Sequence, residues 1–354
     1  MGDFSLYYSK LEKLKKYNES LIGMDFNKIQ SIILNIDEKG FRVEQIFNWI
    51  YVQNVQSIDE MVNLPKSLRE YLVDNYLLNP LKILSITGDN NSQTRKFLLE
   101  CQDGKRIESV LMKENKRITI CISSQVGCAL GCEFCATGTM GIIRNLTVGE
   151  IVAQYLVLSK ESNNPITNVV FMGMGEPFLN YENVLKAADL INDPGGINLG
   201  ARHITISTAG IVPGINKFSK EKRRYKLAIS LNGSTQEQRL KTMPIAKKYP
   251  LIELIGSAKE YYNNTKNFLT FEYVLLSGIN DSVEDAHKLK KLLADFPCKL
   301  NVIPYNEIGG KFKRPNDDRI NGFLNNFKDV PFTVTTRWSK GSDINAGCGQ
   351  LVVK

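Results

Sequence analysis

Residues 123–141 read SSQVGCALGCEFCATGTMG, and this stretch decides how the rest of the chain is interpreted. Three of the seven cysteines fall here, Cys128, Cys132 and Cys135, in the spacing C-x3-C-x2-C. An odd cysteine count in a large chain does not suit a secreted disulfide framework, and clustered thiols in a reducing compartment favour a metal centre. The glycines between them allow a loop to fold closely around a cofactor.

The number of nearby ligands separates two kinds of metal centre. A structural zinc site takes four ligands. The chain has only two histidines, His203 and His287, both far from the three thiols in sequence. Three thiolates suit a cubane cluster with one iron left open, because an ordinary [4Fe–4S] cluster takes four. Zinc with a remote fourth cysteine is the alternative.

Length and composition exclude several protein classes. The chain has 354 residues, 43% hydrophobic and 23% charged, which is ordinary for a globular protein and excludes a disordered or coiled-coil chain. No apolar run approaches the roughly 20 residues of a membrane span, and the N-terminus lacks the apolar core of a secretory signal. We therefore expect a cytoplasmic protein without a membrane partner, and a monomer.

The charge is positive and unevenly placed. The net charge is +8, yet residues 1–90 hold 10 Lys and Arg against 12 Asp and Glu, so the excess lies in residues 91–354. Such an excess is compatible with a polyanionic partner such as RNA but is no proof of one. Three basic runs are candidate phosphate contacts: residues 220–226 (KEKRRYK), Lys247-Lys248, and Lys311 with Lys313 and Arg314.

The periodicity divides the chain into two segments. Residues 1–90 show apolar spacings of three and four and are expected to form a small helical domain. Residues 91–354 begin with a hairpin around Asp103-Gly104 and continue as strands alternating with helices. That alternation predicts parallel βα units and an α/β fold, either a partial barrel or a doubly wound sheet. The expected strands are 118–125, 167–176, 203–210, 225–233, 268–278, 298–306 and 332–338.

The cysteine spacing, with Phe134 before the third cysteine, resembles the radical S-adenosylmethionine (SAM) superfamily. Ordered blocks along most of the chain resemble one branch, the RlmN/Cfr family of RNA methyltransferases. These blocks are FRVEQIFNWIY, SSQVGC, CATGTMG, NLTVGEI, VVFMGMGEP, ISTAGIVPGI, NVIPYN and DINAGCGQL. The resemblance implies a partial (β/α)6 radical SAM barrel with a small N-terminal helical domain that contacts RNA. Val126 and the stretch GEPFLNYENV favour the RlmN branch.

The resemblance also implies a division of labour among thiols. Cys128, Cys132 and Cys135 would hold a [4Fe–4S] cluster, Cys348 would carry a methyl group, and Cys121 would resolve the protein–RNA adduct as a disulfide. Glu108 would accept the ring proton. Taken without the resemblance, Cys348 and Cys121 would be interpreted as structural cysteines and Glu108 as a solvated carboxylate.

The same resemblance assigns SAM contacts, and two SAM molecules are consumed per turnover in the family mechanism. The matching positions are Gly175, Glu176, Ser207, Ser230, Leu231, Asn232 and Asn306. Asn232 departs from the histidine common at its position, but it keeps hydrogen-bonding capacity. Each of these polar residues alone would more often be a turn or cap residue.

The implied activity is methylation of adenine carbon 2 in large-subunit ribosomal RNA and, in some members, transfer RNA. The implied partners are these RNAs and an electron donor such as flavodoxin or ferredoxin. Three alternatives remain: a Cfr-type carbon-8 methyltransferase, another radical SAM enzyme that would not need Cys121 and Cys348, and a non-catalytic zinc-stabilised RNA-binding module.

Overall fold

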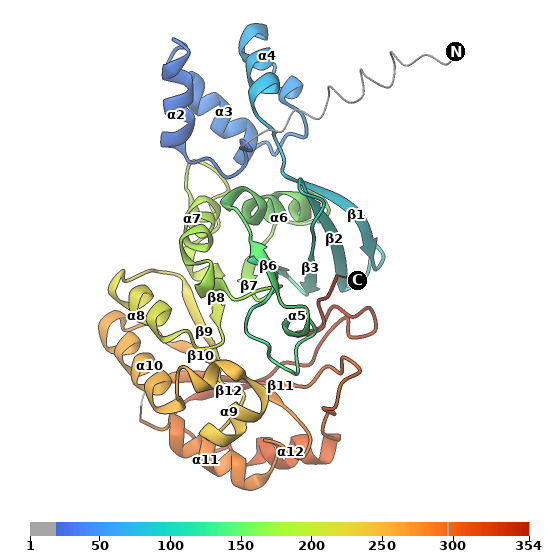
Figure 1. The fold of residues 1–354 in the computed structure, drawn as a ribbon, viewed down its shortest axis with the longest axis vertical. Coiled ribbons are helices and arrows are strands. Elements are labelled where there is room, and N and C mark those ends of the chain that lie inside the picture. Colours follow the sequence, from blue (N-terminus) through green and yellow to red (C-terminus); the bar gives the residue numbers. More distant parts are fainter. Residues whose placement is uncertain (1–18, 296, 354) are drawn as a thin grey trace.

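A small helical domain stands at one end of a larger domain built on a single sheet (Figure 1). The computed structural model describes residues 19–295 and 297–353. No helix in these ranges is long and apolar enough to cross a lipid bilayer. The larger domain holds a ten-stranded sheet in the order β1-β2-β3-β4-β7-β8-β9-β10-β11-β12.

The small domain is helical over residues 19–75, which form part of the expected helical segment 1–90, and residues 1–18 of that segment lie outside the described residues. It comprises α2 (Phe26–Asn35), α3 (Arg42–Tyr51), the 3₁₀ turn η1 (Ile58–Glu60) and α4 (Lys66–Asn75). The Asp25 carboxylate caps α2 by accepting from the Lys28 backbone N–H at 2.7 Å. The Asn54 side-chain amide donates to the Leu156 carbonyl in α6 (Val148–Lys160) at 2.8 Å, which joins this domain to the barrel.

An antiparallel extension of three strands leads into the barrel. β2 (Thr94–Cys101) and β3 (Arg106–Glu114) form the expected hairpin, with Gly104 at φ +74° in its turn. β1 (Leu81–Thr87) pairs with β2 and was not expected, since it lies within the range assigned to helices. It is a mostly exposed edge strand, so its sequence lacks the apolar alternation that marks a half-buried strand.

Seven parallel strands then form the partial barrel, in the order that the sequence predicted. They are β4 (Arg117–Cys121), β7 (Asn168–Phe171), β8 (Ile204–Thr208), β9 (Lys226–Ser230), β10 (Leu269–Leu275), β11 (Cys298–Pro304) and β12 (Thr333–Thr336). The connecting helices are α6, α7 (Tyr181–Asn192), α8 (Val212–Lys220), α9 (Gln236–Thr242), α10 (Leu251–Thr265), α11 (Val283–Leu293) and α12 (Asp317–Asn325). A capping box of Thr147 and Glu150 starts α6.

Short elements complete the connections. The 3₁₀ turns are η2 (Pro177–Leu179), η3 (Ala201–His203) and η4 (Pro244–Lys247). A separate two-stranded ribbon of β5 (Gln125–Gly127) and β6 (Ile142–Asn145) brackets the cysteine loop, which contains α5 (Ala136–Thr139). The sequence analysis did not predict this ribbon. Strands of only three and four residues are too short to show the alternation of apolar and polar residues that marks a strand.

Candidate active site

The cysteine loop is closed at its base by two glycines. Gly127 and Gly141 have φ of +75° and +72°, and the Cys128 N–H donates to the Gly141 carbonyl at 2.9 Å. A Cβ on Gly127 would lie 1.9 Å from the Gly141 oxygen, so no larger residue fits at this position. At the other end, the Ala136 N–H donates to the Gly349 carbonyl at 2.7 Å. The loop is thereby fixed against the C-terminal segment.

The three loop thiols suit an iron–sulfur cluster. Burial raises the pKa of Cys128 to about 12 and also raises the pKa values of Cys132 and Cys135, and the charge of Cys135 raises the pKa of the other two. The thiolate forms therefore need a positive partner, which iron supplies. In the described residues, no three His, Cys, Asp or Glu side chains converge on one ion position. A cubane does not require this, because each thiolate binds a different iron.

Glu176 lies beyond the carboxyl end of β7, beside the cysteine loop. Its carboxylate accepts from the Ala209 N–H at 2.7 Å and the Phe178 N–H at 3.0 Å. Burial raises its pKa to about 7, against the lowering effect of these backbone donors. Gly175 before it has φ of +98°, and a Cβ there would lie 2.5 Å from Gln125 Cβ. A buried carboxylate without a cationic partner among the described side chains suits a ligand ammonium group.

The other expected SAM contacts lie at or just beyond the carboxyl ends of β8, β9 and β11, where functional residues of such barrels gather. Ser207 in β8 is paired with Ala228 in β9 in the register of the two strands. Asn232 has φ of +52° and its side-chain oxygen accepts from the Val274 N–H at 2.9 Å. The Asn306 amide donates to the Cys348 carbonyl at 3.1 Å. These contacts fix the loops around the positions expected to receive SAM: Ser207, Ser230, Leu231, Asn232 and Asn306.

Buried Arg239 was missed by the sequence analysis. In the sequence it lies in a polar helical run and resembles a surface residue. In the structure its guanidinium is fully buried and donates to the carbonyls of Ser230 at 3.0 Å, Leu231, and Ala209 at 3.1 Å. Burial lowers its pKa to about 10, and the nearby Cys132 opposes that shift. Arg239 therefore fixes the carbonyls of two expected SAM-binding loops and places positive charge near the cysteine loop.

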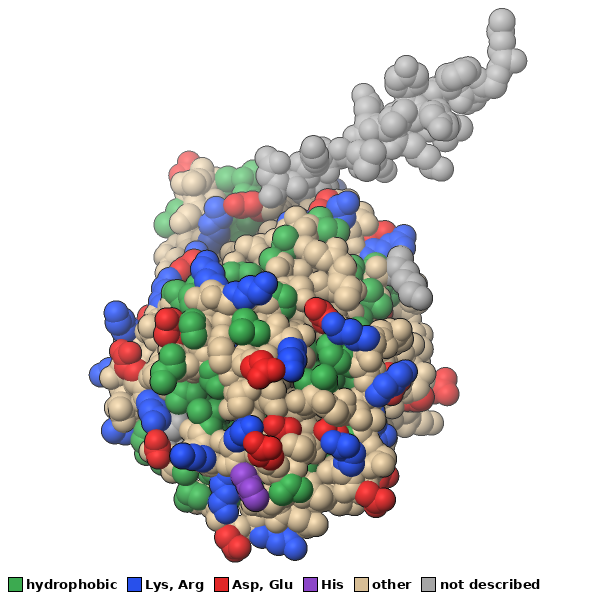
Figure 2. All heavy atoms as spheres, turned by 60° about the horizontal axis from the view of Figure 1, so that its bottom comes forward, with side chains coloured by type: hydrophobic (Ala, Val, Ile, Leu, Met, Phe, Trp, Pro, Cys, Tyr) green, Lys and Arg blue, Asp and Glu red, His purple; other side chains and the backbone are tan. Residues whose placement is uncertain are grey.

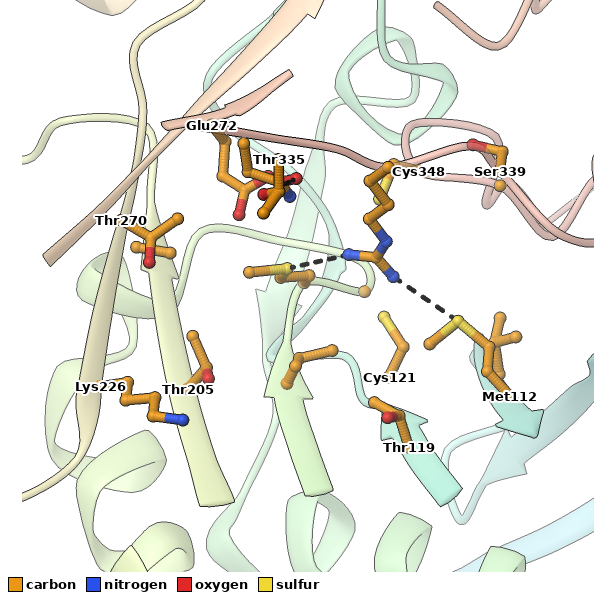
Figure 3. Close-up of a pocket in the computed structure, with 18 of the residues that line it drawn as sticks. Met112, Thr119, Cys121, Thr205, Lys226, Thr270, Glu272, Thr335, Ser339 and Cys348 are labelled. Atoms are coloured by element: carbon orange, nitrogen blue, oxygen red, sulfur yellow. Dashed lines mark hydrogen bonds between the residues drawn. The ribbon is translucent and has the colours of Figure 1, made fainter. Parts of the chain in front are cut away.

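A cavity of about 840 Å³ runs inside the barrel, and Figure 3 shows some of its lining. Cys121 from β4 and Cys348 from the C-terminal segment both line it, and so does Cys135 of the cysteine loop. Arg337 lines the same cavity and interacts electrostatically with both thiols, and Figure 3 shows Cys121 and Cys348 facing this cavity. The sequence places these cysteines 227 positions apart, and the fold brings them to one cavity.

Known proteins resemble the chain over nearly its whole length. The family model described as the radical SAM superfamily matches residues 122–289, and the one described as the ribosomal RNA large subunit methyltransferase N-terminal domain matches residues 19–77. A protein of Dictyoglomus thermophilum named probable dual-specificity RNA methyltransferase RlmN is 43% identical over 94% of this chain and 96% of its own. A Clostridium botulinum protein of that name is 46% identical over 89% of this chain and 91% of its own.

The crystal structure of a radical SAM methyltransferase from Sphaerobacter thermophilus superposes with a TM-score of 0.91. It is 40% identical and covers 94% of this chain and 99% of that one. The chain belongs to the RlmN family of radical SAM methyltransferases. Like other members of the superfamily, it uses a [4Fe–4S] cluster and SAM. The cysteine loop and the buried Glu176 fit these two groups.

The family assignment gives Arg337 a particular interest, although the sequence analysis did not select it. Its guanidinium lies 3.6 Å from the Met112 sulfur and 4.0 Å from the Met172 sulfur, and it forms no ion pair within residues 19–295 and 297–353. The charge of Cys348 raises its pKa, with Glu272 and Cys121 adding to this, while burial opposes the rise. Burial raises the pKa of Cys121 to about 12, and Arg337 opposes that shift. Arg337 thus favours the thiolate form of Cys121.

Glu108 does not line the cavity of this RlmN-family chain. Its carboxylate is buried, pairs with the Lys96 ammonium at 2.9 Å and accepts from the Val352 N–H at 2.9 Å. Val110 and Met112, which follow on β3 at alternate positions, do line the cavity, so Glu108 lies on the same strand face. The C-terminal segment, through Val352, holds its carboxylate back from the thiols.

Proposed function

We propose that this protein methylates carbon 2 of an adenine in large-subunit ribosomal RNA, and that it also accepts transfer RNA. The observation that carries the proposal is the pairing of Cys121 and Cys348 across one cavity beside Cys135. Relatives named as dual-specificity RNA methyltransferases support the substrate class. Cys121 and Cys348 distinguish this reaction from radical SAM chemistry in general, which needs only the three loop cysteines and SAM.

The protein residues divide the work as follows. Cys128, Cys132 and Cys135 hold the cluster, and Glu176 with the loops of Ser207, Asn232 and Asn306 receives SAM. When bound, these groups supply a transferable methyl group and a hydrogen-abstracting radical. The Cys348 thiolate accepts the methyl group. After loss of one hydrogen atom, the methylene radical on Cys348 adds to the ring carbon, and the adduct gives up the ring proton and one electron, which the electron carrier takes back. The target base must leave its stack to reach these atoms.

Product release requires the second thiol. The Cys121 thiolate attacks the Cys348 sulfur, an S–S bond forms and the S–CH2 bond breaks. The electron pair of the broken bond passes to the methylene carbon through the ring, and a solvent proton completes the methyl group. The positive charge of Arg337 lowers the cost of ionising Cys121.

We assign the removal of the ring proton to Glu108. It lies on the β3 face that lines the cavity two residues further along, and its carboxylate pairs with Lys96. To act, it must give up its hydrogen bond with the Val352 N–H and take the ring proton, or reach that proton through one water molecule.

The remaining elements of the proposal concern the setting of the enzyme. Residues 1–90 are the N-terminal domain, whose helices within residues 19–75 form an accessory RNA contact, and residues 91–354 are the barrel domain. The protein acts as a monomer in the cytoplasm, where its seven cysteines stay reduced between turnovers, and takes electrons from a flavodoxin or ferredoxin.

A labelling experiment tests the proposal. Cluster-loaded protein is incubated without oxygen with reductant, unmodified ribosomal RNA and SAM whose methyl group carries deuterium. We expect 2-methyladenosine with two deuterium atoms in the new methyl group, because one is abstracted and one proton comes from solvent. Cys348→Ala should abolish the product, and Cys121→Ala should accumulate a protein–RNA crosslink. Formation of 8-methyladenosine would show that the target is carbon 8 and not carbon 2. Cleavage of SAM without formation of any methyladenosine would refute RNA as the substrate.

A further inference from the structure

The barrel cavity has a second mouth, at the N-terminal ends of the parallel strands. Five basic side chains line the cavity there, and we call them the cationic mouth: Arg117, Arg202, Arg224, Lys226 and Lys299. They come from the starts of β4, β9 and β11 and from the segments just before β8 and β9. Over the whole cavity, eight lining side chains are basic and two are acidic. The lining therefore carries a net positive charge.

The cations of this mouth lack counter-ions among the described residues. No hydrogen bond or ion pair joins any of the five side chains to another group in the portion of the chain that the structure describes. Partial burial, followed by the charges of Lys299, Arg117 and Arg202, lowers the pKa of Lys226, so these groups repel one another. Elsewhere opposite charges are interspersed (Figure 2), with pairs such as Lys288–Glu284 at 2.7 Å. Unpaired like charges at a cavity mouth favour an anionic ligand.

The strand register connects this mouth to the reactive thiols. Cys121 pairs with Val170, Val170 with Thr205, and Thr205 with Lys226, so the four lie on one row across the sheet. Three strand spacings of about 4.8 Å put Lys226 roughly 14 Å along the wall from Cys121. Figure 3 shows Lys226 and Cys121 on this same cavity wall.

The wall between them is not packed with large apolar residues, as the interior of a closed (β/α)8 barrel usually is. Beside apolar side chains such as Val170, Met112 and Met172, it carries small or polar ones, among them Thr119, Thr205, Ala228, Thr270 and Thr335. Such a wall leaves room for a polar ligand of the size of a nucleotide.

An exposed aromatic ring stands beside the cations. Phe268, directly before β10, lines the same cavity and is 57% exposed. Its ring is stacked on Tyr262, with ring centroids 6.2 Å apart and an interplanar angle of 22°. A basic groove with an exposed, supported aromatic ring is typical of sites that bind single-stranded nucleic acid, because any base can stack on the ring.

We propose that the cationic mouth binds the phosphates of the RNA strand that flanks the target adenine, and that the base enters the barrel from this end. The inference rests on the proposed function, since it requires an RNA substrate. The base then reaches Cys121 and Cys348 along the polar wall, while its backbone stays among the cations. An acidic electron-donor protein fits less well, because the cluster ligands lie at the opposite end of the barrel.

The test uses cluster-loaded protein and a fluorescein-labelled single-stranded RNA with one central adenine. Lys226→Gln with Lys299→Gln removes two charges of the mouth, and Lys291→Gln with Lys328→Gln removes two exposed charges elsewhere as the matched control. Each lost phosphate contact lowers the slope of log K against log salt by about 0.7, so the mouth variant should lose about 1.4. At about 0.1 M salt this corresponds to roughly 25-fold weaker binding. Phe268→Ala should weaken binding roughly fivefold or more at an unchanged slope.

Two further measurements separate this inference from a folding defect and from the proposed function. Removing mutually repelling charges should leave the unfolding temperature unchanged or higher, and methylation of Cys348 by SAM should persist. Unchanged RNA affinity in the mouth variant overturns the inference, as does equal weakening in the control. If the mouth variant binds RNA normally but is reduced more slowly by an acidic flavodoxin, the mouth binds the electron donor instead of RNA. Wild-type protein that binds RNA at the mouth but forms no methyladenosine would instead refute the proposed function alone.

Discussion

The buried carboxyl of Glu176 gives a quantitative test of the site. Its pKa rises from an ordinary 4.5 to about 7 because burial disfavours the ionised form. A carboxyl whose pKa is raised on folding binds more protons in the native state than in the unfolded state. The free energy of unfolding therefore falls as pH rises between about 4.5 and 7. From the two pKa values this loss is about 1 kcal/mol at pH 5 and about 3 kcal/mol at pH 8.

Glu176→Gln removes this ionisation. The Gln side chain has one oxygen for the two N–H donors, Ala209 and Phe178, so one donor loses its partner at a cost of about 1–3 kcal/mol. That cost does not depend on pH. The difference in unfolding free energy between variant and wild type should therefore shift by about 2.5 kcal/mol in favour of the variant from pH 5 to pH 8.

Urea unfolding of the protein without cluster or SAM, followed by circular dichroism at several pH values, measures this shift. Glu182→Gln is the matched control, because that carboxylate is exposed on α7, pairs with Lys217, and has a lowered pKa. The difference in unfolding free energy between Glu182→Gln and wild type should not shift in favour of the variant as the pH rises. If the free energies of unfolding of Glu176→Gln and wild type change in parallel with pH, ionisation of the Glu176 carboxyl costs no stability, and the reasoning is refuted. The pH dependence of SAM binding should run the other way. The affinity for SAM should rise with pH up to about 7, because the ionised Glu176 carboxylate binds the ammonium group of SAM.

The remaining predictions concern the thiols and their loop. Alkylation of Cys121, followed by peptide mass spectrometry, should accelerate about tenfold per pH unit from 7 to 10, because its pKa is about 12. A plateau near pH 9 would contradict this. Arg337→Met should raise the pKa of Cys121 further and slow its alkylation at each pH. An unchanged rate would show that the Arg337 charge does not affect the thiol. Gly127→Ala should lose iron on reconstitution, measured by absorbance and iron content, because its Cβ would meet the Gly141 oxygen at 1.9 Å. Gly104→Ala, also at positive φ but with nothing within 4 Å, should retain iron, and equal loss would assign the effect to backbone strain.

Several elements of the fold follow from local patterns in the sequence. Apolar residues at Ile29, Ile32 and Ile33 recur at helical spacing, and all three are buried in α2. The hairpin at Asp103-Gly104 depends on one turn that glycine makes inexpensive. These elements are decided within a few residues, so the sequence can reveal them. β1 and the β5–β6 ribbon escaped prediction because an edge strand, and strands of only three and four residues, carry little periodicity.

The candidate site divides in the same way. The spacing of Cys128, Cys132 and Cys135 is local, so the sequence by itself predicted these thiols as iron–sulfur ligands. With the ordered blocks it identified the family, and the resemblance implied that Cys348 and Cys121 act together. Only the tertiary structure placed both thiols in one cavity, brought Arg337 near both of them, and paired Glu108 with Lys96. It also decided that cations far apart in sequence surround one cavity mouth. These relations depend on strand register and barrel closure, which join residues by distance in space, and local spacing along the chain does not encode that distance.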